Sequence, residues 1–230
     1  MLILYYHRVG NFAPGEPRKL SVEPEVFEAQ MRLLKKFRCN FISADDAVDI
    51  AFGRRKMPRR VALITFDDGY ADTLKYAFPL LKENGIPSVM FIATEHVGKT
   101  DWNHKLHGIM DWAEIKRLHL SGVTIGAHTK THRVLTELAP ADMRAEVEES
   151  KKIIEDRIDA PVKYFAYPKG VYNEEAVKAV QNAGYTAAFG TKKGRKLNKE
   201  HLFEIRRIPV SANDKTRRFL IKITKNLNWV

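Results

Sequence analysis

Cysteine is nearly absent from this sequence, since Cys39 is the only one among 230 residues. A lone thiol cannot form an intramolecular disulfide, which excludes the small disulfide-stapled folds and makes a reducing compartment the default expectation. Long apolar runs are also missing. The longest, at residues 61–64 and 88–93, have the length of a strand and are too short to cross a bilayer.

The sequence also has little that resembles an export leader or a linker. Residues 1–8 contain no basic leader, no long apolar segment and no small-residue cleavage site, so we expect them to belong to the fold. A cytoplasmic protein, with the membrane surface as a second location, is the expectation, and a secreted form whose leader has been trimmed off is the alternative. Without low-complexity tracts or repeats, residues 1–230 are expected to form one domain.

Charge of one sign, by contrast, is in excess. The chain has 39 lysines and arginines against 28 aspartates and glutamates, a formal net charge of +11. Such a charge favours anionic partners: nucleic acid, a membrane surface or an acidic glycan. The basic residues are dispersed, however, and lack the interleaved aromatics of nucleic-acid platforms. We therefore interpret the charge as a lysine-rich solvated surface and expect no nucleic-acid partner.

Short apolar runs alternate along the chain with amphipathic stretches of helical length. The expected strands cover residues 2–6, 61–66, 88–93, 123–126, 164–166, 186–189 and 207–210. The expected helices cover residues 24–37, 73–84, 112–120, 140–158 and 173–182. Alternating β and α units of this size predict an α/β fold with a parallel sheet, and the number of strands favours a closed or nearly closed TIM-like barrel. In such a barrel, catalytic groups lie at the C-terminal ends of strands.

Two segments stand outside this alternation. Residues 95–110 are polar and irregular, and we expect a loop or hairpin over the mouth of the barrel. Residues 214–230 carry apolar side chains at helical spacing among lysines and arginines, which predicts a basic amphipathic helix. Such a helix either packs on the barrel, which is the commoner use, or makes a peripheral contact with an anionic membrane.

Two adjacent carboxylates, Asp67 and Asp68, directly follow an apolar strand candidate and precede Gly69. Adjacent acids at the end of a buried strand repel each other and are costly to desolvate unless a cation or a proton separates their roles. The structural alternative is an Asp-Gly turn that caps a helix.

Two histidines, His128 and His132, follow another strand candidate and its glycine. Histidines four residues apart can bind one ion from a single turn, although a histidine pair on a surface helix is the alternative. Because both motifs follow strands, a barrel would bring them to the same rim. One carboxylate with two imidazoles is a catalytic metal set that leaves positions open for water, and the remaining carboxylate can then act as a general base.

These motifs resemble those of the polysaccharide deacetylase family, which includes chitin and peptidoglycan deacetylases. Residues 65–69 (Thr-Phe-Asp-Asp-Gly) are similar to its first motif, residues 128–132 (His-Thr-Lys-Thr-His) to its second, and residues 110–122 to the segment before the second. The resemblance implies a distorted, incomplete (β/α) barrel and one divalent ion, usually zinc, with nickel, cobalt or iron as alternatives. It also implies the roles of the site residues: Asp67 as the general base, and Asp68, His128 and His132 as the metal ligands.

Residues 164–173 (Tyr-Phe-Ala-Tyr-Pro-Lys-Gly-Val-Tyr-Asn) resemble the third motif but depart from it. Many members have an arginine where Ala166 stands, and that arginine braces the base, so the orientation and pKa of Asp67 are in question. They have an aromatic residue where Lys169 stands, but the Lys169 main-chain N–H can still hold an oxyanion. The Phe-Ala-Tyr-Pro form is similar to the poly-N-acetylglucosamine deacetylase branch. Tyr167 and Trp102 are our candidates for contact with a sugar.

The general acid of the family comes from a late Leu-x-His motif, and this sequence has no clear match to it. The segment Leu4-Tyr5-Tyr6-His7-Arg8 instead resembles the N-terminal Tyr-His motif of the poly-N-acetylglucosamine branch. By that match His7 protonates the departing amine. A histidine that only caps the first strand is the alternative, and His201 is the next candidate for the acid.

The function that the resemblance implies is removal of N-acetyl groups, with release of acetate, from N-acetylglucosamine-type sugars or polysaccharide. The sequence leaves open whether the substrate is a polymer, a lipid-linked sugar or an oligosaccharide, and it leaves the oligomeric state open. A degenerate barrel that binds glycan without catalysis is the alternative, motivated by the altered third motif. Nucleic-acid binding is a third reading, and it lacks a motif.

Overall fold

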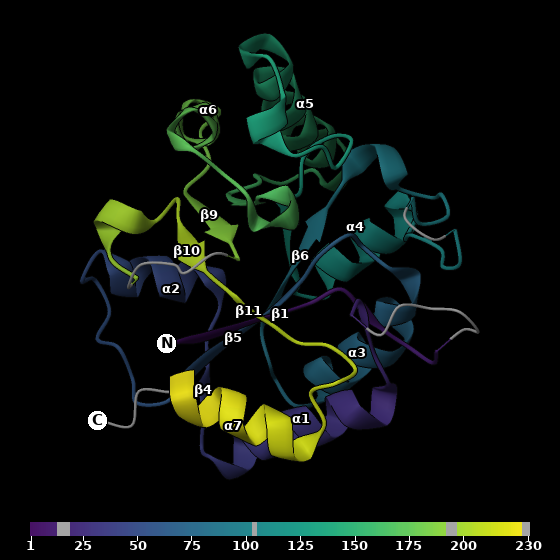
Figure 1. Cartoon of the computed structure of the whole chain (residues 1–230), viewed down its shortest axis with the longest axis vertical. Helices are drawn as coiled ribbons and strands as arrows, with labels where there is room; N and C mark the ends of the chain where they lie inside the picture. Colours follow the sequence, from purple (N-terminus) through teal and green to yellow (C-terminus); the bar gives the residue numbers. More distant parts are fainter. Residues whose placement is uncertain (13–18, 103–104, 192–196, 227–230) are drawn as a thin grey trace.

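In the computed structural model, which describes residues 1–12, 19–102, 105–191 and 197–226, parallel strands curl into a nearly closed barrel with helices around it (Figure 1). The strands in sheet order are β10 (Ile205–Arg206), β9 (Ala187–Gly190), β8 (Tyr164–Ala166), β7 (Thr124–Ala127), β6 (Ser88–Ile92), β5 (Val61–Phe66), β1 (Leu2–Tyr6) and β11 (Ile208–Pro209). β4 (Asn40–Phe41) pairs with β5, and β2 (Arg8–Val9) pairs with β3 (Ser21–Val22) in a separate two-stranded sheet. The distorted α/β barrel expected from the sequence is confirmed.

One extended segment bridges the two edges of this sheet. β10 pairs with β9, since Ile205 lies opposite Phe189, whereas β11 pairs with β1, since Ile208 lies opposite Leu4. Only Arg207 separates β10 from β11. Strand β10 therefore extends the edge of the sheet at β9, and β11 extends the edge at β1. This single segment closes the barrel, and the closure is irregular; we call it the seam.

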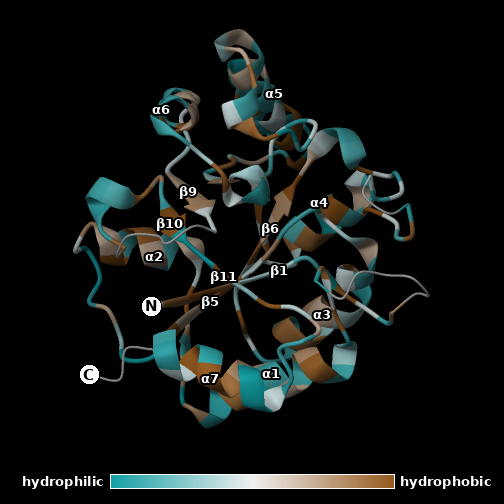
Figure 2. Cartoon of the chain, viewed as in Figure 1, coloured by the Kyte–Doolittle hydropathy of each residue, from teal (hydrophilic) through white to brown (hydrophobic). Residues whose placement is uncertain are grey.

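The helices cover the outside of the strands, and Figure 2 shows apolar residues gathered on the strands and on the helix faces that meet them. They are α1 (Pro24–Lys36), α2 (Ala44–Ala51), α3 (Ala71–Glu83), α4 (Trp112–Leu120), α5 (Pro140–Ile158), α6 (Glu174–Asn182) and α7 (Thr216–Asn226). The described residues also form the 3₁₀ turns η1 (Thr94–His96), η2 (Leu135–Glu137), η3 (Pro168–Gly170) and η4 (Lys199–His201). Helix α2 and the two-residue strands β2, β3, β4 and β10 were not predicted from the sequence.

Successive side chains along each strand point alternately outward to the helices and inward to the barrel, so the core has two layers. Leu2 and Leu4 of β1 face the helices, whereas Ile3 joins an interior cluster. Ala47 and Val48 of α2 belong to the same interior cluster, together with residues near the starts of β1 and β5. Helix α2 thus covers the end of the barrel at which the strands begin, whereas Asp67, Asp68 and His128 follow strands at the opposite end.

The structure describes most of the two segments that stand outside the alternation. Within 95–110, Thr100 and Gly108 form an antiparallel bridge, so the segment is a hairpin-like loop, of which residues 103–104 lie outside the described part. The C-terminal helix is α7, and residues 227–230 of the predicted helix lie outside the described part. Helix α7 packs on α1 and buries Phe219 and Ile223. None of the described helices is long and apolar enough to cross a membrane.

Candidate functional site

The polar residues singled out from the sequence meet at the C-terminal ends of the strands. His7 follows β1, Asp67 and Asp68 follow β5, and His128 follows β7. A pocket of about 370 Å³ opens among them. It is lined by Tyr5, His7, Lys19, Leu20, Asp67, Asp68, His128, His132, Lys169, Gly170 and Thr191. Residues far apart in the sequence therefore share one pocket, as the parallel barrel requires.

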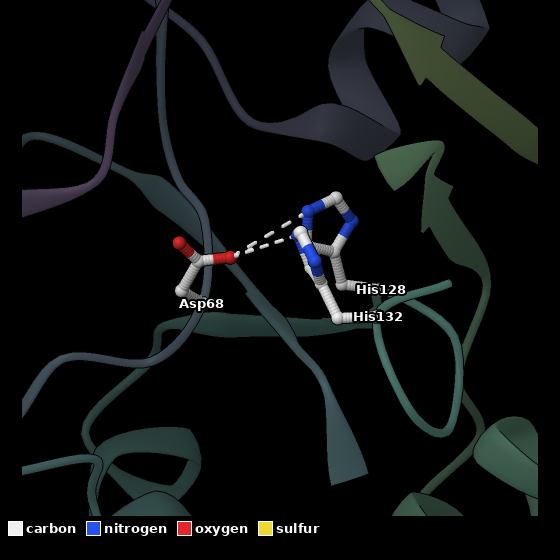
Figure 3. Close-up of side chains that lie close together, drawn as sticks. All are labelled: Asp68, His128 and His132. Carbon is white, nitrogen blue, oxygen red and sulfur yellow. Dashed lines mark ion pairs between the residues drawn. The ribbon is translucent and has the colours of Figure 1, made fainter. Parts of the chain in front are cut away.

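Asp68, His128 and His132 lie close enough to bind a single ion (Figure 3). Asp68 Oδ1 is 3.7 Å from His128 Nε2 and 3.5 Å from His132 Nε2. One ligand atom from each residue lies within 4.8 Å of the others. The two imidazole rings meet edge to face, with centroids 4.9 Å apart, so both nitrogens converge on the carboxylate.

Neighbouring groups prepare these three residues for a cation. His128 Nδ1 donates to the Ala166 carbonyl oxygen at 2.6 Å, which leaves Nε2 as the ligand atom. Asp68 Oδ1 is buried and accepts no hydrogen bond from the described residues. Burial, together with the charge of Asp67, raises the pKa of Asp68 well above its usual value. A buried carboxylate that lacks a hydrogen-bond donor among the described residues and faces two imidazoles fits a divalent cation.

Burial also disfavours the charged form of both histidines. It lowers the pKa of His128, and burial with the nearby His128 lowers the pKa of His132 to about 2. Neutral imidazole is the form that binds a metal ion, so the surroundings favour the ligand state of both rings.

Asp67 lies next to Asp68 but has a different partner. Its carboxylate accepts two hydrogen bonds from Arg207, at 2.6 Å from Nη1 and 2.8 Å from Nη2. Burial alone would raise the pKa of Asp67, but the Arg207 guanidinium and His128 lower it below its usual value. Asp67 is therefore an ionised carboxylate in a fixed orientation, which is the state that a general base needs.

Arg207 orients Asp67 in place of the arginine that many family members have where Ala166 stands. This role of Arg207 was not predicted from the sequence. The guanidinium is buried, donates also to the Thr65 hydroxyl at 3.2 Å, and lies 4.8 Å from the Tyr5 ring centroid. The signal was present as a charged residue at the start of the strand predicted for 207–210. In an otherwise apolar barrel strand, a buried arginine requires an anionic partner.

His7 lines the pocket beside the two acids. Burial lowers the pKa of His7 to about 4, in opposition to Asp67, which raises it. Its Nδ1 is buried and has no hydrogen-bond partner among the described residues. The imidazole is therefore neutral at pH 7 and can exchange a proton with a bound molecule.

Lys169 and Trp102 lie at the border of the site, but Tyr167 does not. Lys169 lines the pocket from η3 and has a left-handed φ of 54°. The Trp102 ring packs against His132, with centroids 4.6 Å apart. The Tyr167 ring is fully buried in the core and its hydroxyl donates to the Phe203 carbonyl at 3.1 Å. The Tyr167 ring is therefore part of the core next to η3 and does not line the pocket.

The next candidate for the acid, His201, lies in η4, where its Nδ1 is 3.1 Å from Glu204 Oε2. It is not among the residues that line the pocket. Of the two histidines considered for the acid, the structure therefore places only His7 with the acids and the histidine pair.

Four of the eight non-glycine residues with a positive φ in the described part of the chain lie at the site. Asp68, Thr129, His132 and Lys169 all have a positive φ, between 54° and 73°, although none is glycine. Such conformations cost of order 1–3 kcal/mol each and persist only where the surroundings enforce them. Their concentration here indicates that the pocket geometry, rather than local preference, determines the backbone.

Comparison with known proteins gives the same family. The family model described as polysaccharide deacetylase matches residues 54–188, and the chain belongs to that family. YxkH of Bacillus subtilis is 29% identical over 209 residues, covering 91% of this chain and 71% of the relative. A poly-β-1,6-N-acetyl-D-glucosamine N-deacetylase of Staphylococcus aureus is 27% identical over 231 residues, covering 91% of this chain and 78% of the relative.

Solved structures share the fold along almost the whole chain. The Streptococcus pyogenes deacetylase PplD, in complex with acetate, superposes with a TM-score of 0.83 at 23% identity and covers 97% of both chains. IcaB from Ammonifex degensii gives a TM-score of 0.82 at 23% identity, covering 97% of this chain and 95% of its own. At this identity the structures establish the barrel and not the substrate.

Proposed function

We propose that the protein is a metal-dependent N-deacetylase that hydrolyses the acetamido group of an N-acetylglucosamine-type sugar and releases acetate. The observation that carries this proposal is the division between two adjacent acids: Asp67 is paired with Arg207, whereas Asp68 faces His128 and His132. Asp67 is held ionised as a base, whereas Asp68 has an oxygen without a hydrogen-bond donor among the described residues and faces two imidazoles, as a ligand of a cation does.

Asp68, His128 and His132 would hold the ion, and zinc suits one oxygen and two nitrogen ligands best. When bound, such an ion supplies a water of lowered pKa and a Lewis acid for the acetamide carbonyl. Asp67 takes a proton from the attacking water, and Arg207 keeps the carboxylate aimed at it. The Lys169 main-chain N–H donates to the oxygen that becomes negative as the carbonyl carbon turns tetrahedral.

The remaining step is cleavage of the C–N bond, for which the nitrogen needs a proton. His7 enters the reaction neutral because its pKa is about 4. In our proposal it takes that proton from Asp67 and passes it to the departing nitrogen. The products are acetate and the sugar amine: one proton of the water reaches the nitrogen through Asp67 and His7, and the other, released as the acid product ionises to acetate, is taken up by the amine.

The substrate class rests on the relatives. The S. aureus relative is named for deacetylation of poly-β-1,6-N-acetylglucosamine, and it aligns with 91% of this chain. The rival function, a barrel that binds glycan without catalysis, was suggested by Ala166 in place of the family arginine. The contact between Arg207 and Asp67 removes that reason, because the base has its guanidinium from another strand.

Acetate release from N-acetylglucosamine oligosaccharides of increasing length, with β-1,6 and β-1,4 linkages, tests the proposal. We expect turnover that chelation abolishes and zinc restores. Asp67→Asn should retain zinc but lose at least about a hundredfold in kcat, the usual scale of general base catalysis. His128→Ala/His132→Ala should lose the zinc itself. Turnover that is unaffected by Asp67→Asn, or equal zinc in wild type and the double variant, would contradict the assignment.

A further inference from the structure

The three-residue connection between His128 and His132 is held by a side chain from another element. Glu146 of α5 is buried, and its Oε2 accepts the main-chain N–H groups of Lys130 at 2.9 Å and Thr131 at 2.8 Å. Its Oε1 accepts the Thr131 hydroxyl at 2.5 Å. One carboxylate thus receives three hydrogen bonds from the loop that carries the second histidine.

The carbonyl groups of the same loop are held from the opposite direction by η1. The Thr129 carbonyl accepts the Thr94 N–H at 3.3 Å, and the Lys130 carbonyl accepts the Glu95 N–H at 2.8 Å. His96 Nε2 lies 3.3 Å from the Thr131 carbonyl oxygen. Hydrogen bonds therefore hold the loop on both its N–H side and its carbonyl side.

This support has a geometric reason. Thr129 and His132 both adopt left-handed backbone conformations, with φ of 65° and 61°, which residues with a Cβ rarely occupy. A loop freed from Glu146 would relax toward ordinary φ values and move His132 away from Asp68. We propose that Glu146 is a positioning residue that sets the affinity of the metal site without touching the metal. This inference rests on the proposed function.

Zinc affinity, measured by competition with a chromogenic chelator, tests the proposal without relying on turnover. We expect Glu146→Ala to weaken zinc binding about 10- to 100-fold, the usual effect of removing a partner that orients a metal ligand. Glu146→Gln should restore most of it, because the amide oxygen can accept both N–H groups and the amide nitrogen can donate to the Thr131 hydroxyl. The matched control is Glu149→Ala, on the same helix, where the half-exposed carboxylate forms an ion pair with the Lys130 ammonium and accepts none of the main-chain hydrogen bonds described for the loop.

Three outcomes separate this inference from the proposed function. A wild-type protein that binds no zinc would contradict the proposed function. Zinc affinity unchanged in Glu146→Ala, or equally weak in Glu146→Gln, would overturn the positioning role. Should Glu146→Ala fail to fold, Thr131→Val removes a single hydrogen bond of the set and should give a smaller loss of affinity, whereas no loss would contradict the role.

A second inference comes from the charges that line the pocket. Its carboxylates are Asp67, which is paired with Arg207, and Asp68, which faces the histidines. The other charged side chains that line it are the exposed lysines Lys19 and Lys169, and neither forms an ion pair with a described residue. Among the described residues, a substrate that enters the pocket therefore meets two lysines that no described carboxylate pairs.

We infer that the preferred substrate carries an anionic group, a phosphate or a uronate, next to the acetamido sugar. An anion near two ammonium groups is attracted, whereas a neighbouring glucosamine ammonium is repelled. The inference rests on the proposed function and narrows its substrate class. Phosphate and carboxylate share this chemistry, so the test needs a substrate of each kind.

The test compares kcat/KM for three N-acetylglucosamine substrates: a neutral oligosaccharide, one that alternates with glucuronate, and a glycosyl phosphate. At about 0.02 M salt we expect one or both anionic substrates to be favoured several-fold, and about 0.5 M salt should reduce the difference. Replacing Lys19 and Lys169 together by glutamine should abolish the preference, while Lys178→Gln, exposed on α6, should keep it.

Each outcome of this comparison decides one question. A preference that survives the double lysine replacement, or equal rates for all three substrates at low salt, would overturn the inference. The substrate with the larger advantage identifies whether phosphate or uronate is the natural anion. Acetate release from none of them would contradict the proposed function instead.

Discussion

At the scale of single residues, the site depends on how two neighbouring carboxylates are kept different. Asp67 and Asp68 are both almost fully buried, so burial raises the pKa of each. Arg207 overcomes this effect at Asp67, but no described residue does so at Asp68. Two adjacent carboxylates disfavour each other's charge. Because Arg207 already neutralises Asp67, Asp68 is the carboxylate that remains available to bind a cation.

Replacing Arg207 should separate stability from catalysis. Arg207→Met leaves the buried Asp67 carboxylate unpaired, and we expect the free energy of unfolding to fall by about 3–5 kcal/mol. The double variant Asp67→Leu/Arg207→Met removes both charges, so it should regain part of that stability while remaining inactive. Chemical denaturation and acetate release measure the two effects. A double variant no more stable than Arg207→Met would show that Arg207 matters through packing rather than charge.

His7 offers a second test at this scale. His7→Ala should lower kcat on an N-acetyl substrate about 10²- to 10⁴-fold, the range for general acid–base catalysis, and leave zinc in place. An activated acetyl ester should lose less, because its leaving group departs without a proton. Parallel assays on both substrates and zinc analysis measure the difference. Full activity on the N-acetyl substrate would show that the assignment to His7 is wrong.

At the scale of elements, the sequence predicted most of the barrel because its strands are short, apolar and separated by amphipathic helices. It predicted β5 correctly, since residues 61–66 are apolar and end at two acids. It missed α2, which is only eight residues long and depends on a capping box between Ser43 and Asp46. A helix this short gives a weak periodic signal in the sequence. Its position at the end of the barrel depends on tertiary packing, which the local sequence does not specify.

The candidate site was predictable where motif and strand end coincide, as at Asp67, Asp68, His128 and His132. Arg207 and Glu146 could not be found in the same way. Each acts from a different element on a residue more than a dozen positions away, Arg207 on Asp67 and Glu146 on Thr131. Such contacts follow from closure of the barrel and leave no local pattern in the sequence.

The turn η3, which carries Lys169, depends on the glycine that follows. Gly170 has a φ of +66°, and a Cβ placed on it would lie 1.9 Å from Thr191 Oγ1 and 2.5 Å from the Thr191 main-chain nitrogen. Gly170→Ala should therefore displace the turn, at a cost of about 1–3 kcal/mol for overpacking in addition to about 1 kcal/mol for the backbone. Turnover should fall with it.

Gly184→Ala is the control for the glycine test. Gly184 has a similar φ of +79°, but a Cβ there would meet nothing within 4 Å. This variant should lose only the backbone contribution, about 1 kcal/mol, and keep its turnover. Thermal unfolding and kcat of both variants make the comparison. Equal losses in the two would show that the contact with Thr191 is unimportant for the turn.

At the scale of the whole molecule, the C-terminal part of the chain completes the barrel and then covers it. The segment that contains β10 and β11 closes the seam, and α7 follows it onto α1. Asp214, at the bend between them, is buried; its Oδ2 is 2.6 Å from Lys222 Nζ, and its main-chain carbonyl accepts Gln30 Nε2 at 2.8 Å. Phe219 and Ile223, the buried apolar residues of the described part of α7, therefore pack against the protein itself.

Substitutions on the two faces of α7 should consequently have unequal effects. Phe219 is 0% exposed and Ile221 is 47% exposed. Phe219→Ala should lower the free energy of unfolding by about 3–5 kcal/mol, as expected for a buried aromatic residue, whereas Ile221→Ala should stay within about 0.5 kcal/mol of wild type. Urea unfolding measures both. Co-sedimentation with anionic vesicles provides the opposing test, because a helix that served mainly as an anchor would bind vesicles less well after Phe219→Ala and lose little stability.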